Sequence, residues 1–430
     1  FDGSDLFGVD KKYRYLPLYS VSGLWRISQE PFMANAKWID NLVVRASYGL
    51  QGNIDKNTSP YLLGNYRIEN ILPGGSEDMI DVSGAPNKKL RWEKTHSVNA
   101  GFDFAVLNQA INLSVDYYYR KGVDLIGTQM LPLETGFEML TVNWASMQNQ
   151  GVEVALSTRN IHTKNFMWTT NFNFAYNNNK ILKEALREDA LEPGREGYPV
   201  GALFALKTAG LDEEGYPMFQ DKDGKAVSAM EFFKLQEWGF GATDLTARER
   251  RELYTYVGTA DCPYTGGFNN TFTYKAFELG VNFSFDFGGK VRSQPTYSIV
   301  DFDKGRNTNR DILNRWTPEN TETIFPVLLS QNERLDEYMW YSNQNEIYRN
   351  LDIWIRDLNY VRLQNIRLGY TLPTNFSRTL GMTSATVAIE GRNLLVFGSS
   401  YKNYLDPETM SNAYATPAPK SVTLSLNLIF

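Results

Sequence analysis

The chain is poor in the residues that build metal centres and disulfides. Its 430 residues include one cysteine, Cys262, and two histidines, His96 and His162. A single cysteine cannot form an internal disulfide. The three residues also lie too far apart in the sequence for the close ligand spacing of a local zinc motif. We therefore expect no metal and no cofactor.

Long apolar runs and an excess of positive charge are also missing. No segment approaches the roughly 18 consecutive apolar residues that a membrane helix requires. The formal net charge of -6 argues against a nucleic-acid partner, which would require a basic surface. The start at Phe1 lacks the basic and apolar regions of a signal peptide, so we expect either a mature exported protein or a piece of a longer one.

What the chain does contain is alternation, and it is clearest in the last ten residues. One parity is apolar, and the positions between are Ser421, Thr423, Ser425 and Asn427, with Ile429 as the exception. In a strand, such alternation gives one apolar face and one small, uncharged polar face. This pattern is typical of the closing strand of an outer-membrane barrel. The residues expected to face lipid are Val422, Leu424, Leu426, Leu428 and Phe430.

The alternation recurs along the whole chain and predicts eleven strands. The segment 277–287 spans about ten alternating positions, close to the 9–11 residues that a tilted strand needs to cross a bilayer. In 356–372 the alternation changes phase, which a β-bulge near Gln364-Asn365 would reconcile. The predicted strands lie at 19–28, 39–51, 98–104, 111–119, 152–156, 166–176, 268–274, 277–287, 356–372, 383–397 and 421–430.

Short and long connections alternate between these strands. Barrels of the outer membrane join their strands by tight periplasmic turns and extended extracellular loops. With a periplasmic carboxyl terminus, the strand at 19–28 runs inward and residues 1–18 belong to an outer loop. The connections expected outside the cell are 52–92, 121–147, 178–265, 290–355 and 398–417.

An odd strand count argues against a complete barrel. Bacterial single-chain barrels have an even number of strands, and an open sheet edge in lipid leaves backbone groups unsatisfied. We therefore interpret residues 1–430 as the C-terminal half of a larger transmembrane antiparallel β-barrel.

Ten short segments, in a shared order, resemble the C-terminal barrel of SusC/RagA-type TonB-dependent transporters. They are Asp2-Gly-Ser-Asp-Leu-Phe-Gly8, Leu24-Trp-Arg-Ile-Ser-Gln-Glu-Pro-Phe-Met33, Ala46-Ser-Tyr-Gly-Leu-Gln-Gly-Asn53, Leu90-Arg-Trp-Glu-Lys-Thr95, Asp116-Tyr-Tyr-Tyr-Arg120, Asn149-Gln-Gly-Val-Glu153, Gly266-Gly-Phe-Asn-Asn270, Arg315-Trp-Thr317, Tyr360-Val-Arg-Leu-Gln-Asn365 and Gly391-Arg-Asn-Leu-Leu395. No segment resembles that family's TonB box, plug domain or early strands.

The resemblance implies a 22-stranded barrel in the outer membrane of a Gram-negative bacterium, of which eleven strands are half. It also implies TonB-dependent import of oligosaccharides or peptides beneath a SusD-like lipoprotein lid. The implied partners are the N-terminal plug-bearing half of the transporter, the lipoprotein, TonB acting through that missing half, the substrate and outer-membrane lipid.

Two features of the longest connection have simple structural interpretations. Asp221-Lys-Asp223-Gly224 lacks the further ligands of a calcium loop and favours a turn between two short strands over a cation site. Thr246 followed by Glu249 is the pattern of a capping box, so a short charged helix is expected after Thr246.

An aromatic cluster in the predicted loop 290–355 offers a candidate contact site. It comprises Tyr338, Trp340 and Tyr341, with Tyr348 and Trp354 nearby. Such rings could stack on sugar rings, hold the loop together from inside, or meet the lid protein. All three interpretations stay open at this point.

Catalysis is not expected. The carboxylates on the polar parity are interpreted as wetted lumen residues paired with Arg45, Arg120 and Arg159, because nothing brings two of them together as a hydrolase requires. A soluble secreted β-rich glycan-binding module is the main alternative, and a barrel enzyme using His96 or His162 is a third. The carboxylates are Asp103, Asp116, Glu153, Glu278 and Asp286.

Overall fold

The protein is almost entirely β-structure. The computed structural model describes residues 2–3, 9–55, 58–72, 75–236, 243–293, 305, 310–328, 350–379, 381–398, 406–409 and 415–430. Within these ranges the α-helices are single turns or little more, and none is long and apolar enough to span a membrane. They are α1 (Ala229–Phe232), α2 (Ala247–Glu252) and α6 (Thr374–Thr379).

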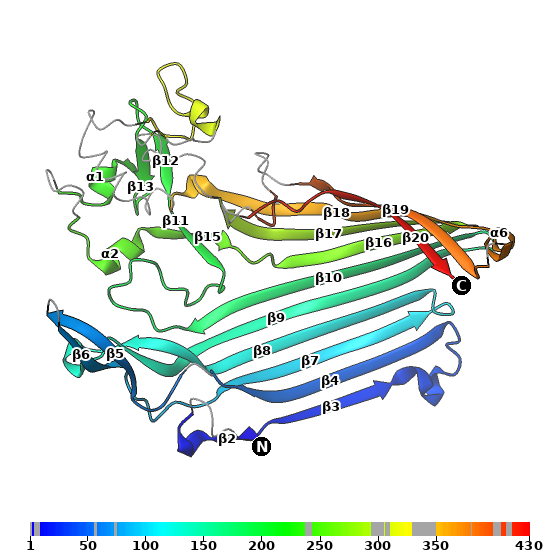
Figure 1. Ribbon diagram of the computed structural model, residues 1–430, viewed down its shortest axis with the longest axis horizontal. Coiled ribbons are helices and arrows are strands. Elements are labelled where there is room, and N and C mark those ends of the chain that lie inside the picture. Colours follow the sequence, from blue (N-terminus) through cyan, green and yellow to red (C-terminus); the bar gives the residue numbers. More distant parts are fainter. Residues whose placement is uncertain are drawn as a thin grey trace.

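Eleven strands form one large antiparallel sheet in which sequence neighbours are also spatial neighbours. The sheet is curved and open, with β3 at one edge and β20 at the other (Figure 1). The prediction of eleven antiparallel strands is confirmed. They are β3 (Tyr19–Arg26), β4 (Ile39–Asn53), β7 (Glu93–Val106), β8 (Ile111–Met130), β9 (Met139–His162), β10 (Phe166–Lys183), β16 (Tyr264–Tyr274), β17 (Phe277–Arg292), β18 (Ile355–Thr371), β19 (Ser384–Phe397) and β20 (Ser421–Ile429).

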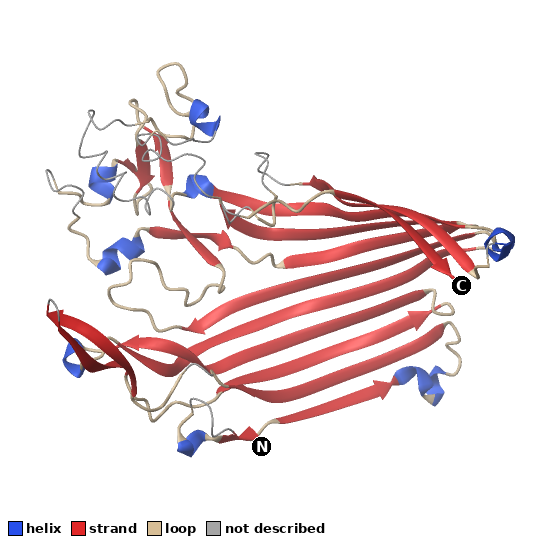
Figure 2. Ribbon diagram, viewed as in Figure 1, coloured by secondary structure: helices blue, strands red, loops and turns tan. Residues whose placement is uncertain are grey.

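The two ends of the sheet differ in their connections. At the short-turn end, strands are joined through 27–38, 107–110, 163–165, 275–276 and 372–383. The turn at 107–110 is tight because Leu107, Asn108 and Gln109 all have positive φ, between 56° and 58°. The small sheets and most of the helices gather at the opposite, long-connection end (Figure 2).

One predicted loop is for the most part strand. β8 and β9 stay paired as far as Met130 and Met139, so the predicted connection 121–147 shrinks to 131–138. The sequence pattern did not reveal this extension because the register shifts between Gly122 and Leu125, around Asp124 with φ 57°. Such a bulge breaks the alternation from which strands are predicted.

The bulge predicted near Gln364-Asn365 is present. Asn365 pairs with Asn282 and Leu363 with Phe283, so Gln364 is the extra residue. The register with β19 shifts at the same place. The bulge keeps both halves of β18 in phase with one apolar face and one polar face.

The remaining elements are small. The hairpin of β5 and β6 lies between β4 and β7, and the pairs β11–β15 and β12–β13–β14 lie in the connections after β10. Their bounds are β1 (Asp2–Gly3), β2 (Tyr15–Leu16), β5 (Leu63–Leu72), β6 (Gly75–Gly84), β11 (Ala202–Leu206), β12 (Thr208–Leu211), β13 (Pro217–Gln220), β14 (Ala226–Val227) and β15 (Tyr254–Thr259). The 3-10 helices are η1 (Lys11–Tyr13), η2 (Ile27–Gln29), η3 (Pro31–Met33), η4 (Leu133–Thr135), η5 (Arg310–Asn314) and η6 (Asp352–Trp354).

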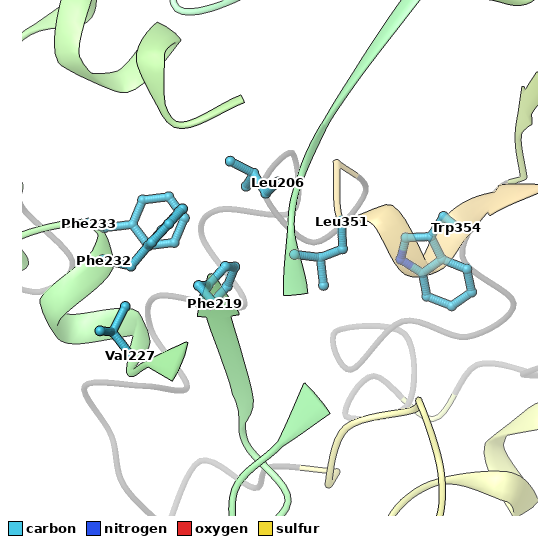
Figure 3. Packing of buried hydrophobic residues seen from close by; sticks show 7 residues of the cluster. All are labelled: Leu206, Phe219, Val227, Phe232, Phe233, Leu351 and Trp354. Carbon is cyan, nitrogen blue, oxygen red and sulfur yellow. The ribbon is translucent and has the colours of Figure 1, made fainter. Parts of the chain in front are cut away.

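The main apolar core lies in the long-connection region and not in the sheet. There, β13, α1 and the segment leading into β18 contribute buried side chains that pack together (Figure 3). A smaller core joins Val9, Leu16 and Trp92 beside β2. The long connections are therefore folded units, stabilised by their own apolar cores.

Candidate functional site

The apolar face of the sheet carries two rows of aromatic residues. On β16, Tyr264 and Tyr274 end the strand on the same face, ten residues apart. That is ~33 Å along the strand. With a strand tilt of about 40° it corresponds to ~25 Å in height, the apolar band of outer-membrane barrels. Register places Tyr117, Val152, Tyr176, Tyr264 and Phe287 in one row and Phe166, Tyr274, Phe277 and Tyr370 in the other.

The polar residue Asn270 lies between these rows, and its side chain is hydrogen-bonded. Asn270 is buried, and its Oδ1 accepts from Trp168 Nε1 at 2.9 Å and from Thr170 Oγ1 at 2.8 Å. A side-chain oxygen facing hydrocarbon would be costly without such partners. This arrangement suits an apolar environment.

The predicted closing strand, β20, lies at an edge of the sheet and pairs only with β19. Its apolar parity is well exposed, with Leu424 at 76% and Phe430 at 81%. The opposite edge, β3, pairs only with β4, and no contact between β3 and β20 closes the sheet in the described residues. Both edges therefore have unused backbone hydrogen-bonding groups.

The polar face of the sheet is lined by charged residues at mid-height. A cross-strand row runs from Arg45 on β4 through Asp116, Glu153 and Thr265 to Asp286 on β17. A hollow of about 460 Å³ lies over this row, lined by Asp116, Glu153 and Asp286 among others. Three carboxylates in one hollow give this part of the face an acidic character.

Arg45 binds two of the five predicted carboxylates. Its Nη2 lies 3.1 Å from Asp103 Oδ1 and 2.8 Å from Asp116 Oδ2, and it also donates to Ser114. Because these side chains are about one-third exposed, the pairs orient the guanidinium more than they stabilise the fold.

The pairing predicted for Arg120 and Arg159 is wrong. Arg120 lies over the ring of Tyr118, at 5.2 Å, and Arg159 donates to the carbonyl of Asn108. Side-chain reach explains the difference, because each arginine finds an aromatic face or a carbonyl closer to its own strand.

The other carboxylates have different partners or none. Glu278 pairs with Arg367 at 3.1 Å, and Asp286 accepts a hydrogen bond from the Tyr360 hydroxyl. Glu153 is exposed and makes no ion pair or side-chain hydrogen bond within the described part of the chain. It lies directly across from Asp116 in the strand register.

A buried ion network missed by the sequence analysis joins β18 to the connection between β19 and β20. Arg362 is 2% exposed and binds Asp406, which is also buried, and Glu408 at 2.9 Å. Glu408 and Asp286 both accept from the Tyr360 hydroxyl. The turn at 406–409 is thereby fixed on the polar face of the sheet.

Asp406 also organises its own turn. Its carboxylate accepts from the backbone N–H groups of Glu408 and Ala418. Burial alone would raise the pKa of Asp406, but the hydrogen bond from Arg362 and these N–H groups bring it below its ordinary value. An arginine on the polar parity of a strand was the one available sequence signal; its partners lie more than forty residues away.

Only one of the predicted loop aromatics can be placed. Trp354 is fully buried in the apolar core of the long-connection region, beside Leu351 and with Phe325 at a ring distance of 5.8 Å (Figure 3). It therefore holds the loops together from inside. Tyr338, Trp340, Tyr341 and Tyr348 lie outside the described residues.

The two features predicted in the longest connection are as expected. Asp221 accepts from the N–H groups of Asp223 and Lys225, which makes the turn between β13 and β14. Thr246 and Glu249 form a complete capping box at α2, and the hydrogen bond from the Thr246 N–H lowers the pKa of Glu249 to about 2. Among the described residues, no three acidic, histidine or cysteine side chains are placed to hold a metal ion.

Comparison with known sequences points to one family of receptors. Residues 1–206 match the profile described as TonB dependent receptor-like, beta-barrel. The whole chain aligns with TonB-dependent receptor P3 of Formosa agariphila at 27% identity, and with TonB-dependent receptor SusC of Bacteroides thetaiotaomicron at 25%. The chain spans 43% and 41% of the length of these two relatives.

Solved structures agree on the fold. The RagAB peptide transporter matches 98% of this chain with a TM-score of 0.75 at 24% identity, and the RagAB peptide importer in the 'open-open' state matches all of it with 0.76 at 23%. Each match covers 44% of the larger chain. The resemblance to SusC/RagA-type transporters is confirmed, and the chain contains a β-barrel segment of the TonB-dependent receptor type.

Proposed function

We propose that this chain forms part of the barrel wall of a TonB-dependent importer in the bacterial outer membrane. The observation that carries the proposal is the sheet itself, with an apolar band ~25 Å high between two aromatic rows and a polar face behind it. The apolar face would lie against lipid, including Val422, Leu424, Leu426, Leu428 and Phe430 of the closing strand. The polar face would line the lumen.

The proposed orientation places the long connections outside the cell and the carboxyl terminus in the periplasm. The asymmetry of the connections supports this direction, since folded caps with their own apolar cores occur only at one end of the sheet in the described ranges. The rest of the longer protein would supply the remaining strands, the plug and the segment that contacts TonB.

The proposed substrates are oligosaccharides or peptides, captured between the outer loops and a SusD-like lipoprotein lid. The names of the relatives support this assignment, since SusC and a peptide importer are both among them. Tyr338, Trp340 and Tyr341 are proposed, from their sequence position alone, to contact the ligand or the lid. The proposed mechanism is transport without covalent chemistry.

Affinity purification of the full-length protein from native outer membranes, followed by uptake assays, tests this function. We expect a detergent-dependent complex containing a lipoprotein, and uptake that stops when TonB is deleted. A monodisperse protein that needs no detergent would contradict the proposal and favour a soluble glycan-binding module.

A further inference from the structure

A row of uncharged amides crosses the polar face between the carboxylates and the short-turn end. Six consecutive strands, β8 to β18 in spatial order, each place one residue in it. Direct register partners link each member to the next. The row is Asn112, Ser157, Asn171, Asn269, Asn282 and Asn365, called the amide row below.

The amide row borders a hollow of about 410 Å³. Asn171, Asn269 and Asn282 are among its lining residues. The neighbouring row toward the carboxylates contributes Ala155 and Gly267, whose small side chains leave the space open. The hollow is therefore a shallow trough with amide groups along one side and a small-residue floor.

The amides of this row have hydrogen-bonding capacity to spare. Within the described residues, the side chains of Asn171, Asn269, Asn282 and Asn365 make no hydrogen bond to other protein groups. Each amide offers two donors and an acceptor oxygen. The charge nearest to them in the trough, Asp103, is already bound by Arg45 and Ser114.

We infer that the trough along the amide row binds a neutral, hydroxyl-rich chain, such as a linear oligosaccharide, lying across the strands. This inference rests on the proposed import function. Groups that both donate and accept, without net charge, complement hydroxyls better than they complement ammonium or carboxylate groups. A ligand that bridges several amides would replace water at each of them.

The spacing of the row favours a sugar chain over a peptide. Neighbouring strands lie ~4.8 Å apart, so the amides repeat at about that interval. One ring of a linear hexose oligomer is of similar length. An extended peptide repeats its groups on one side every two residues, about 6.7 Å, and would fall out of step with the row.

Binding to the full-length transporter, measured by titration calorimetry in detergent, tests the inference. The probes are neutral linear glucan oligomers of increasing length and an uncharged, end-capped peptide. The double variant Asn171→Leu/Asn282→Leu removes two amides, and Ala155→Leu fills the trough while keeping them. Thr271→Val, on the same face of β16 but outside the trough, is the matched control.

We expect the affinity for the longer glucans to fall about tenfold or more in the double variant and in Ala155→Leu, since each lost hydrogen bond is worth up to about tenfold. Thr271→Val should bind like the parent. Glucan binding that is unchanged in both trough variants, or peptide binding that falls equally, would overturn the inference alone. A parent protein that binds neither probe would overturn the proposed function as well.

Discussion

At the residue scale, Arg362 carries the strongest test of the structure. It is the one fully buried guanidinium in the described residues, and it compensates the buried carboxylate of Asp406. Substituting one partner of such a pair leaves an uncompensated charge and costs about 3–5 kcal/mol. We therefore expect Arg362→Met to release the 406–409 turn from the sheet.

A spin label at Thr416→Cys in a Cys262→Ser background would report this release as increased mobility. Arg392→Met is the control, because Arg392 pairs with Glu390 on an exposed part of β19 and should have no effect on the label. Arg362→Met/Asp406→Leu should restore part of the order, since no buried charge is left unpaired. A label equally immobile in Arg362→Met and the parent would contradict the role given to Arg362.

The lowered pKa of Asp406 predicts how the same turn responds to acid. A carboxyl group with a depressed pKa in the folded state stabilises the fold above its ordinary pKa of about 4, and this stabilisation is lost as the pH falls through the lowered value. The label at position 416 should therefore keep one mobility from pH 7 to about 5 and become mobile only below about pH 4.

Asp406→Asn supplies the comparison for the acid response. It cannot titrate, so its label mobility should no longer change with acid at this site. Release of the parent turn near pH 6 would mean that another group controls it.

At the element scale, the bulge in β18 holds the two faces of the sheet in phase. Gln364 is the extra residue, so its deletion should turn Tyr360 and Arg362 toward the apolar face. We expect the variant lacking Gln364 to lose the compact, heat-modifiable form of a folded barrel on unheated gels. Deleting Glu188, in the exposed connection after β10, is the matched control and should be tolerated.

The same element shows what sequence reasoning can reach. Alternation predicts all eleven strands and this bulge, because period-two patterning reflects which face is apolar. It fails at 121–147, where the bulge around Asp124 interrupts the period although pairing continues. The Arg362 network was out of reach for another reason, since it joins residues distant in sequence through a loop fold that no local pattern encodes.

On the scale of the whole molecule, the sheet divides its surroundings into two. Aromatic rows delimit an apolar band on one face, while the other carries the carboxylate row and the amide row. Its two edge strands, β3 and β20, need further strands to satisfy their backbone groups in a bilayer. A chain spanning about two-fifths of its relatives is consistent with that need.

The most direct test of this account is a cysteine scan of β20 in the full-length protein, in outer-membrane vesicles and a Cys262→Ser background. Each position from Val422 to Leu428 receives an environment-sensitive fluorophore, and quenching by a lipid-phase quencher is compared with quenching by a water-soluble one. The account predicts alternation, with lipid-phase quenching at Val422, Leu424, Leu426 and Leu428 and aqueous quenching at Thr423, Ser425 and Asn427. Uniform aqueous quenching along the strand would contradict it.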